Sequence, residues 1–192
     1  MLPFPLAPPR VHRLDSSAEA QLLFRARAGD HEAIAVLYSR FRDRMVQLAY
    51  GVLRDRESAE DAAQEILLRA FDKMPFFPCE SAFAAWLYRL GLNLCLDRKR
   101  LVERRAHLLD SSAPPPCFER APDEQVETRL ELERALDELD EAARVILLLR
   151  ELHELSFGEI AAILGISVSA AKRRLSDAHR KFRRIWEAHH AE

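Results

Sequence analysis

Four side chains with the chemistry of nucleic-acid recognition recur along one edge of a predicted helix, Phe83 to Arg100 ("FAAWLYRLGLNLCLDRKR"). At about 3.6 residues per turn, the helix has an apolar stripe of Phe83, Leu87, Leu90 and Leu94. A second stripe, roughly a quarter-turn away, holds Trp86, Arg89, Asn93 and Arg100. Aromatic rings stack on unpaired bases, amides read base edges, and guanidinium groups pair with phosphates. The pattern predicts a surface for single-stranded nucleic acid, with packed Trp and solvated Arg as the structural alternative.

A second surface is predicted on the preceding helix, "AEDAAQEILLRAF". Its apolar face contains Ala59, Ala62, Ala63, Ile66, Leu67, Ala70 and Phe71. Its polar face contains Glu60, Asp61, Gln64 and Glu65. An acidic and amide-bearing face suits a basic protein partner. Ser58 and Asp61 resemble a capping box, which predicts that the helix begins at Ser58.

A helix-turn-helix is predicted in "LSFGEIAAILGISVSAAKRRLSDAHRKF" near the C-terminus. Ser156 and Glu159 have capping-box spacing, Gly165 permits a tight turn, and Ser167 caps the next helix. The predicted buried stripe of that second helix is Val168, Ala171, Leu175, Ala178 and Phe182. Its outward side chains are Ser169, Lys172, Arg173, Ser176, Asp177 and Arg180. Small polar and basic residues on this face favour DNA binding in a major groove over a merely solvated hairpin.

Composition excludes several other classes of protein. The net charge of −2 combines an acidic stretch at 123–141 with a basic one at 172–184, which indicates two faces with different partners. Three widely spaced cysteines fit a reducing cytosol rather than a disulfide framework. The sequence contains no run of about 18 apolar residues, so no membrane-spanning segment is predicted. Neither a nucleophile–base pair, a phosphate-binding glycine loop nor a metal-spaced cluster is present, so we expect no enzyme activity, no cofactor, no metal and no small-molecule substrate.

The helical periodicity predicts an all-α protein of two small domains joined by a flexible linker. Residues 1–17 are predicted to be a disordered arm and residues 18–105 the N-terminal domain. Clustered Pro, Ser and Asp predict a linker at 106–125. The C-terminal domain, with its helix-turn-helix, is predicted at 126–188, followed by a tail at 189–192.

These segments, in this order, resemble an extracytoplasmic-function (ECF) sigma factor of the sigma-70 family. "RDRESAEDAAQEILLRAF" resembles the polymerase-binding helix of that family, and "ESAFAAWLYRLGLNLCLDRKR" resembles its promoter-melting segment. The segment from "LDELDEAARVILLLREL" through "AAKRRL" resembles its C-terminal DNA-binding domain. The resemblance implies a cytoplasmic bacterial protein that brings core RNA polymerase to promoters. It implies contacts with the β′ clamp helices and β flap of polymerase, with promoter DNA and, as in many relatives, with an anti-sigma factor.

The resemblance also implies a role for each matched residue. Polymerase binding falls on Glu60, Asp61, Gln64 and Glu65. Contact with the minus-ten element falls on Phe83, Trp86, Tyr88, Arg89, Asn93, Arg98 and Arg100. Contact with the minus-thirty-five element falls on Ser169, Lys172, Arg173, Arg174, Ser176, Asp177 and Arg180.

The sequence departs from the family pattern at two places. Pro78 and Cys79 replace Arg and Gly in the loop that captures a flipped base in relatives, and Asp177 and His179 stand where relatives often carry Arg. Because an aspartate repels phosphate but accepts from cytosine N4, we expect an altered minus-thirty-five preference. Two rival classes remain at this point: a helix-turn-helix regulator that acts without polymerase, and an adaptor or anti-sigma module that binds only protein.

Overall fold

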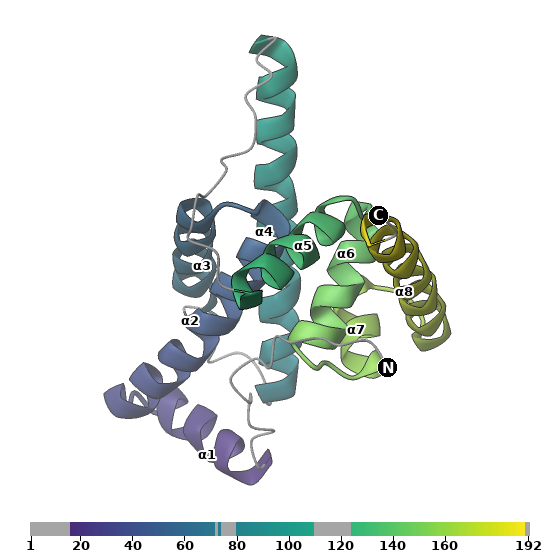
Figure 1. Cartoon of the computed structure of the whole chain (residues 1–192). Coiled ribbons are helices and arrows are strands. Elements are labelled where there is room, and N and C mark those ends of the chain that lie inside the picture. The colour runs from purple at the N-terminus through teal and green to yellow at the C-terminus, as the bar shows by residue number, and fades with distance from the viewer. Residues whose placement is uncertain (1–15, 72, 74–79, 110–123, 191–192) are drawn as a thin grey trace.

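Helices make up the regular structure of the described chain. A computed structural model describes residues 16–71, 73, 80–109 and 124–190. Its elements, in order, are α1 (Ser16–Arg27), α2 (His31–Leu53), α3 (Arg56–Phe71), α4 (Glu80–Leu109), α5 (Glu124–Asp137), α6 (Glu141–Leu147), the π-helical turn η2 (Leu148–Leu152), α7 (Phe157–Leu164) and α8 (Val168–His189) (Figure 1). No strand occurs among these residues, and the predicted all-α class is confirmed.

Helices α1 to α4 form an N-terminal unit around the apolar stripe of α2. Leu37, Phe41, Met45 and Leu48 recur at helical spacing, and all four are buried. Helix α3 packs along α2 through a row of buried alanines, and small side chains at a contact let two helix axes approach closely. This packing turns the polar face of α3 outward.

Aspartates before the helices set where α2 and α3 begin. The Asp30 carboxylate accepts from the backbone N–H groups of Glu32 and Ala33 at 3.0 and 3.2 Å and caps α2. The Asp55 carboxylate accepts from the backbone N–H of Ser58 at 2.8 Å. Helix α3 therefore begins at Arg56, and the predicted start at Ser58 is wrong because an earlier side chain supplies the cap.

A buried arginine joins α5 to α6 in the C-terminal unit. The Arg144 guanidinium of α6 donates to the backbone oxygens of Leu136, Asp137 and Leu139 at 2.8, 2.8 and 3.1 Å. These carbonyls lie at the C-terminal end of α5, where a helix leaves its acceptors without intrahelical donors. Helix α6 continues into η2, whose π-helical winding ends at the buried His153.

Helix α4 runs past the predicted domain boundary. It continues to Leu109, α5 begins at Glu124, and α1 begins at Ser16, so the predicted linker and arm overlap these helices at their ends. The rest of those predicted segments, residues 110–123 and 1–15, lies outside the described residues. Figure 1 shows the C-terminal half of α4 extending away from the other helices.

The two units pack against each other, which the sequence analysis did not anticipate. Helix α7 contacts α4, and α6 contacts α2. Gly51 of α2 is buried against Leu148, and a Cβ atom at position 51 would lie 2.5 Å from Leu148 Cδ1. Arg54 Nε lies 2.8 Å from a carboxylate oxygen of Asp137 at the end of α5. The interface therefore combines an apolar contact that only glycine accommodates without a shift and an ion pair.

Candidate functional site

The turn between α7 and α8 is built from local caps, as predicted. Ser156 Oγ accepts from the backbone N–H of Glu159 at 3.3 Å, and the Glu159 carboxylate accepts from the backbone N–H of Ser156 at 2.8 Å. Gly165 ends α7 with a φ of 64°, in the left-handed region that suits glycine. Ser167 Oγ accepts from the backbone N–H of Ala170 at 3.1 Å and starts α8. These bonds fix the direction in which α8 leaves the turn.

Helix α8 presents a polar and basic face to solvent. Ala171, Leu175, Ala178 and Phe182 are buried as predicted, whereas Val168 is 45% exposed because it stands at the first helical position, beyond the packed turn. The side chains that face solvent are Ser169, Lys172, Arg173, Arg174, Ser176 and Arg180, with Asp177 half-buried. This arrangement supplies hydroxyl and cationic donors at a helix N-terminal half, as a recognition helix requires.

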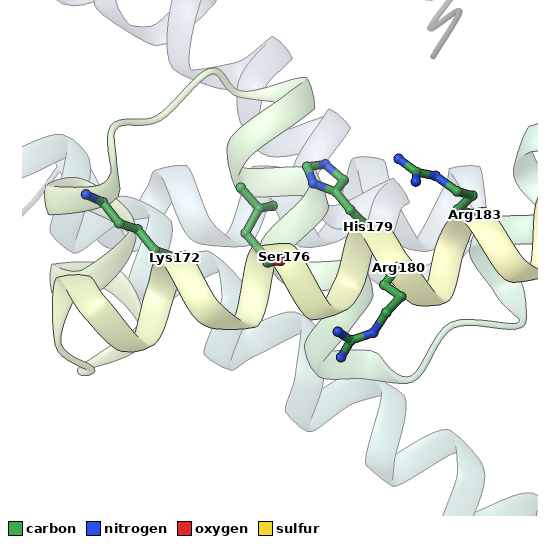
Figure 2. A pocket seen from close by; sticks show the side chains of 6 residues that line it. Lys172, Ser176, His179, Arg180 and Arg183 are labelled. Atoms are coloured by element: carbon green, nitrogen blue, oxygen red, sulfur yellow. The ribbon is translucent and has the colours of Figure 1, made fainter. Parts of the chain in front are cut away.

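A pocket of about 450 Å³ lies along the same face. Its lining is Lys172, Leu175, Ser176, His179, Arg180 and Arg183. Figure 2 shows that Lys172, Ser176, His179 and Arg183 follow one another along α8. Three of the lining side chains are cationic and one is a hydroxyl, so the pocket has the donors that a phosphate or a base edge accepts from.

Partners within the chain distinguish the charged groups of α8. The Asp177 carboxylate accepts from Arg180 Nη2 at 2.6 Å, and His179 Nε2 lies 3.1 Å from a Glu151 oxygen. Arg173 and Arg174 are exposed and make no ion pair with any described residue. Arg180 therefore shares its charge with a neighbouring carboxylate, whereas Arg173 and Arg174 do not share theirs with any described carboxylate.

On α4, the predicted stripe divides into an exposed edge and a packed base. Arg89 and Asn93 are exposed and Trp86 is half-buried, so these three lie at the surface together. Phe83 is fully buried, with its ring 6.3 Å from that of Trp86 and 5.3 Å, edge-on, from that of Phe41. Phe83 supports the edge from below and is covered by α2 in this conformation, and its contact with DNA stays a prediction.

Tyr88 is also withdrawn from the predicted DNA surface. Its side chain is 2% exposed, and its hydroxyl lies 3.1 Å from Nδ1 of His153 in the C-terminal unit. Burial raises the pKa of Tyr88 to about 12. The family resemblance placed Tyr88 beside the promoter strand together with Arg89, but residues one position apart on a helix face different directions.

Arg98 and Arg100 are engaged by carboxylates. Arg98 pairs with Glu65 of α3. Arg100 lies 3.7 Å from Asp97 on its own helix and 3.7 Å from Glu141 of α6. In this conformation both guanidinium groups link helices, and a DNA strand would compete with these carboxylates for them.

The polar face of α3 is exposed as predicted and carries an apolar residue that the prediction missed. Glu60, Asp61 and Gln64 are exposed, and Glu65 is half-buried. Leu68 is 65% exposed, one turn beyond Gln64. The signal was present in the sequence, because position 68 follows positions 61, 64 and 65 at helical spacing. Leu68 adds apolar area to this polar face, although a single exposed leucine is ordinary at a protein surface.

Metal ligands and thiols are the remaining groups to place among the described residues. No three His, Cys, Asp or Glu side chains among them come together as a metal site needs. Burial raises the pKa of the Cys95 thiol to about 12, which disfavours the reactive thiolate. Cys79, the thiol of the predicted base-capturing loop, lies outside the described residues. None of the described helices is sufficiently long and apolar to span a bilayer.

Comparison with family models matches both units of the chain. Residues 37–105 match the model for sigma-70 region 2, and residues 129–182 match the model for sigma-70, region 4. The first range covers α4 with its exposed edge and the polar face of α3, and the second covers the helix-turn-helix. The three surfaces derived above thus fall within the two matched regions.

Similar proteins share this organisation. The ECF RNA polymerase sigma factor SigW of Bacillus subtilis is 30% identical over 160 residues, which cover 77% of this chain and 85% of SigW. The ECF RNA polymerase sigma factor SigM of Mycobacterium tuberculosis is 31% identical over 168 residues, which cover 88% and 84% of the two chains.

Solved structures show the same arrangement of helices. CnrH in complex with the cytosolic domain of CnrY superposes with a TM-score of 0.68 at 28% identity, over 89% of this chain and 98% of CnrH. The fold is shared, at 23% identity and a TM-score of 0.63, with the sigma factor RpoE in complex with the anti-sigma factor NepR from Bartonella quintana, over 82% and 97% of the two chains. The chain therefore belongs to the ECF sigma factors, RNA polymerase sigma factors of the sigma-70 family.

Proposed function

We propose that this sigma factor docks on core RNA polymerase through α3, holds the unpaired minus-ten strand on α4 and reads the minus-thirty-five element with α8. The observation that supports the proposal is that one chain carries two exposed surfaces of different chemistry, each suited to a different form of nucleic acid. The exposed edge of Trp86, Arg89 and Asn93 offers a ring, a cation and an amide, which suit a single strand. The basic face of α8 suits a duplex.

Docking on polymerase is assigned to the outer face of α3. Glu60, Asp61 and Gln64 supply charge and amide groups for the basic β′ clamp helices, and Leu68 supplies apolar area at the same surface. The β flap is the proposed second contact on polymerase. With a net charge of −2, the protein alone has weak electrostatic attraction to DNA, so specificity arises when polymerase holds both units at the promoter.

The proposal extends to an inhibitor and to the place of action. CnrH and RpoE were solved with CnrY and the anti-sigma factor NepR, respectively, and we propose an anti-sigma factor as a partner of this chain. A protein that acts with polymerase on chromosomal DNA works in the cytoplasm and by binding, so we assign it no catalytic residue. A helix-turn-helix regulator that acts without polymerase is not favoured, since both sigma-70 regions match.

The test is transcription by purified protein and sigma-free core polymerase on a library of promoter sequences. The proposal expects initiation from a selected set whose sequences share two elements. A protein that binds specific duplexes alone but starts no transcription with polymerase would contradict the proposal and restore the regulator. The charge-reversal variant Asp61→Lys on α3 should lose initiation while it keeps the helical content of the native chain. Ser39→Ala, on the exposed surface of α2, is the control.

A further inference from the structure

One buried hydrogen bond joins the two units at the centre of their interface. Tyr88 Oη on α4 and His153 Nδ1 at the end of η2 are 3.1 Å apart, although 65 residues separate them in the chain. Their rings meet edge-on, with centroids 5.1 Å apart. The side chains are 2% and 7% exposed. The second ring nitrogen of His153, Nε2, is buried and has no partner among the described residues.

Closure of this interface is incompatible with simultaneous contact at both promoter elements. Elements centred at minus ten and minus thirty-five are about 25 base pairs apart, or ~85 Å along B-DNA. In this structure α4 contacts α7 and α7 contacts α8. Packed helix axes lie about 8–10 Å apart, so α4 and α8 are separated by only about 20 Å. The two units must part before both surfaces reach their elements.

Closure also occupies groups on α4. Tyr88 is covered by the C-terminal unit, and Glu141 of α6 lies 3.7 Å from Arg100 and 4.0 Å from Lys99. The Glu141 carboxylate would therefore compete with a phosphate for these two cations.

We propose that the Tyr88–His153 hydrogen bond and the Gly51–Leu148 contact form a latch that holds the protein closed in the absence of polymerase. That this latch must open before the protein binds a promoter rests on the proposed function. The latch itself rests only on the contacts between the two units.

The latch has a built-in response to pH. Burial, with a smaller contribution from Arg44 of α2, lowers the pKa of His153 to about 3 in the closed form. The hydroxyl of Tyr88 is the titratable group in contact with His153. Tyr88 in turn feels the charges of Arg44 and of Glu159 on α7. Once the units part, His153 regains an ordinary pKa of about 6.5. The equilibrium constant for closure is therefore highest above pH 6.5. It falls about tenfold for each pH unit below that value, because only the open form binds the proton.

Energy transfer between dyes on the two units measures closure without polymerase or DNA. Cysteines are introduced at the exposed positions Ser39 of α2 and Ala188 of α8. Cys79 and Cys117 are replaced by serine, and Cys95 is retained because it is buried and its high pKa suppresses labelling. Single-molecule traces then give the fraction of open molecules.

Two variants break the latch from different sides. Tyr88→Phe removes the hydroxyl and should raise the open fraction about tenfold, as expected for a lost hydrogen bond that leaves a buried acceptor unpaired. Gly51→Ala should also raise it, because the new Cβ pushes against Leu148, while alanine favours the α2 helix itself. Glu57→Gln, a change at an exposed position of α3, is the control and should leave the open fraction unchanged.

The decisive comparison is between the open fractions of the native chain and of the His153→Asn variant as the pH is lowered. Between pH 7.5 and 5.5 the open fraction of the native chain should rise about tenfold. His153→Asn keeps an acceptor for Tyr88 but cannot titrate, so its open fraction should stay constant. The latch is wrong if the native chain is already open, if neither Tyr88→Phe nor Gly51→Ala opens it, or if His153→Asn responds to acid as the native chain does. Parallel transcription assays separate the two proposals: a chain that opens as described but never initiates retains the latch and loses the proposed function.

Discussion

Arg98 of α4 pairs with Glu65 of α3, so the helix assigned to the promoter strand is tied to the helix assigned to polymerase. Arg69 of α3 pairs with the same carboxylate. Glu65→Gln removes the negative charge that both guanidinium groups share. Because all three side chains are partly exposed, we expect a loss of only about 0.5–1 kcal/mol in the free energy of unfolding, measured by chemical denaturation. Glu60→Gln, which breaks the more exposed pair with Arg56, is the control, and an equal loss there would contradict a joining role for Glu65.

Asn93→Ala tests base reading on α4. The amide is exposed beside Arg89 and Trp86, so its removal should cost discrimination at the minus-ten element without loss of folding. A good amide–base pair contributes about 1–3 kcal/mol. The ratio of run-off transcript from preferred to altered minus-ten sequences should therefore fall roughly tenfold. Polymerase binding should not change. A ratio equal to that of the native protein would remove Asn93 from the site.

Arg173→Ala and Arg174→Ala test phosphate contacts on α8. Both side chains are exposed and have no ion-pair partner among the described residues. Each substitution should reduce the slope of log binding constant against log salt by about one, with similar loss on all promoters. Binding of labelled promoter duplex by the polymerase complex at several salt concentrations measures that slope. An unchanged slope in both variants would place the duplex elsewhere.

Asp177→Ala should act differently from these two variants. The Asp177 carboxylate holds Arg180 at 2.6 Å, so its loss releases a guanidinium and removes an acceptor for cytosine N4. We expect a changed minus-thirty-five preference together with tighter binding overall, read out by selection from a randomised element. Selection of the native sequence by the variant would show that Asp177 does not set the preference.

Arg144→Met tests the junction of α5 and α6. The substitution leaves the carbonyl oxygens of Leu136, Asp137 and Leu139 without their donors. A loss of about 2–4 kcal/mol in the free energy of unfolding is expected from charged hydrogen bonds that are buried. Urea denaturation measures it, and a change below about 0.5 kcal/mol would contradict the assignment.

Asp140 gives the C-terminal unit a dependence on acid. A hydrogen bond from Lys181 of α8, together with one from the backbone N–H of Ala143, lowers the pKa of this carboxyl below its usual 3.8. A lowered pKa in the folded protein means that the contribution is complete above pH 3.8 and is lost as pH falls through the lower folded value. Asp140→Asn keeps a helix cap but loses the charge. Its deficit in thermal stability should therefore be largest near neutral pH and shrink below pH 4.

Features fixed by neighbouring residues were predictable from the sequence. The capping box of Ser156 and Glu159, the turn at Gly165 and the cap at Ser167 all involve residues within a few positions of each other, and the structure contains each one. The buried stripe of α8, apart from Val168, followed from its helical periodicity. The family resemblance was confirmed by the matches to both sigma-70 regions.

Features that depend on distant segments were not predictable in the same way. Tyr88 looked like a surface residue because periodicity cannot show that His153, from another unit, covers it. Gly51 gave no signal of its own, since its role appears only with Leu148 opposite. The assignments of individual residues to polymerase, to the minus-ten strand and to the minus-thirty-five element remain predictions.

Helix α4 carries a mechanical consequence. It is one continuous helix of 30 residues, about 45 Å long at 1.5 Å per residue, and no proline interrupts it. A rod of this kind has no joint between Asn93, at the strand-binding edge, and Val102, on the projecting half. A force on the projecting end therefore tilts the whole helix. A partner bound to that end would set the angle at which the strand-binding edge meets DNA.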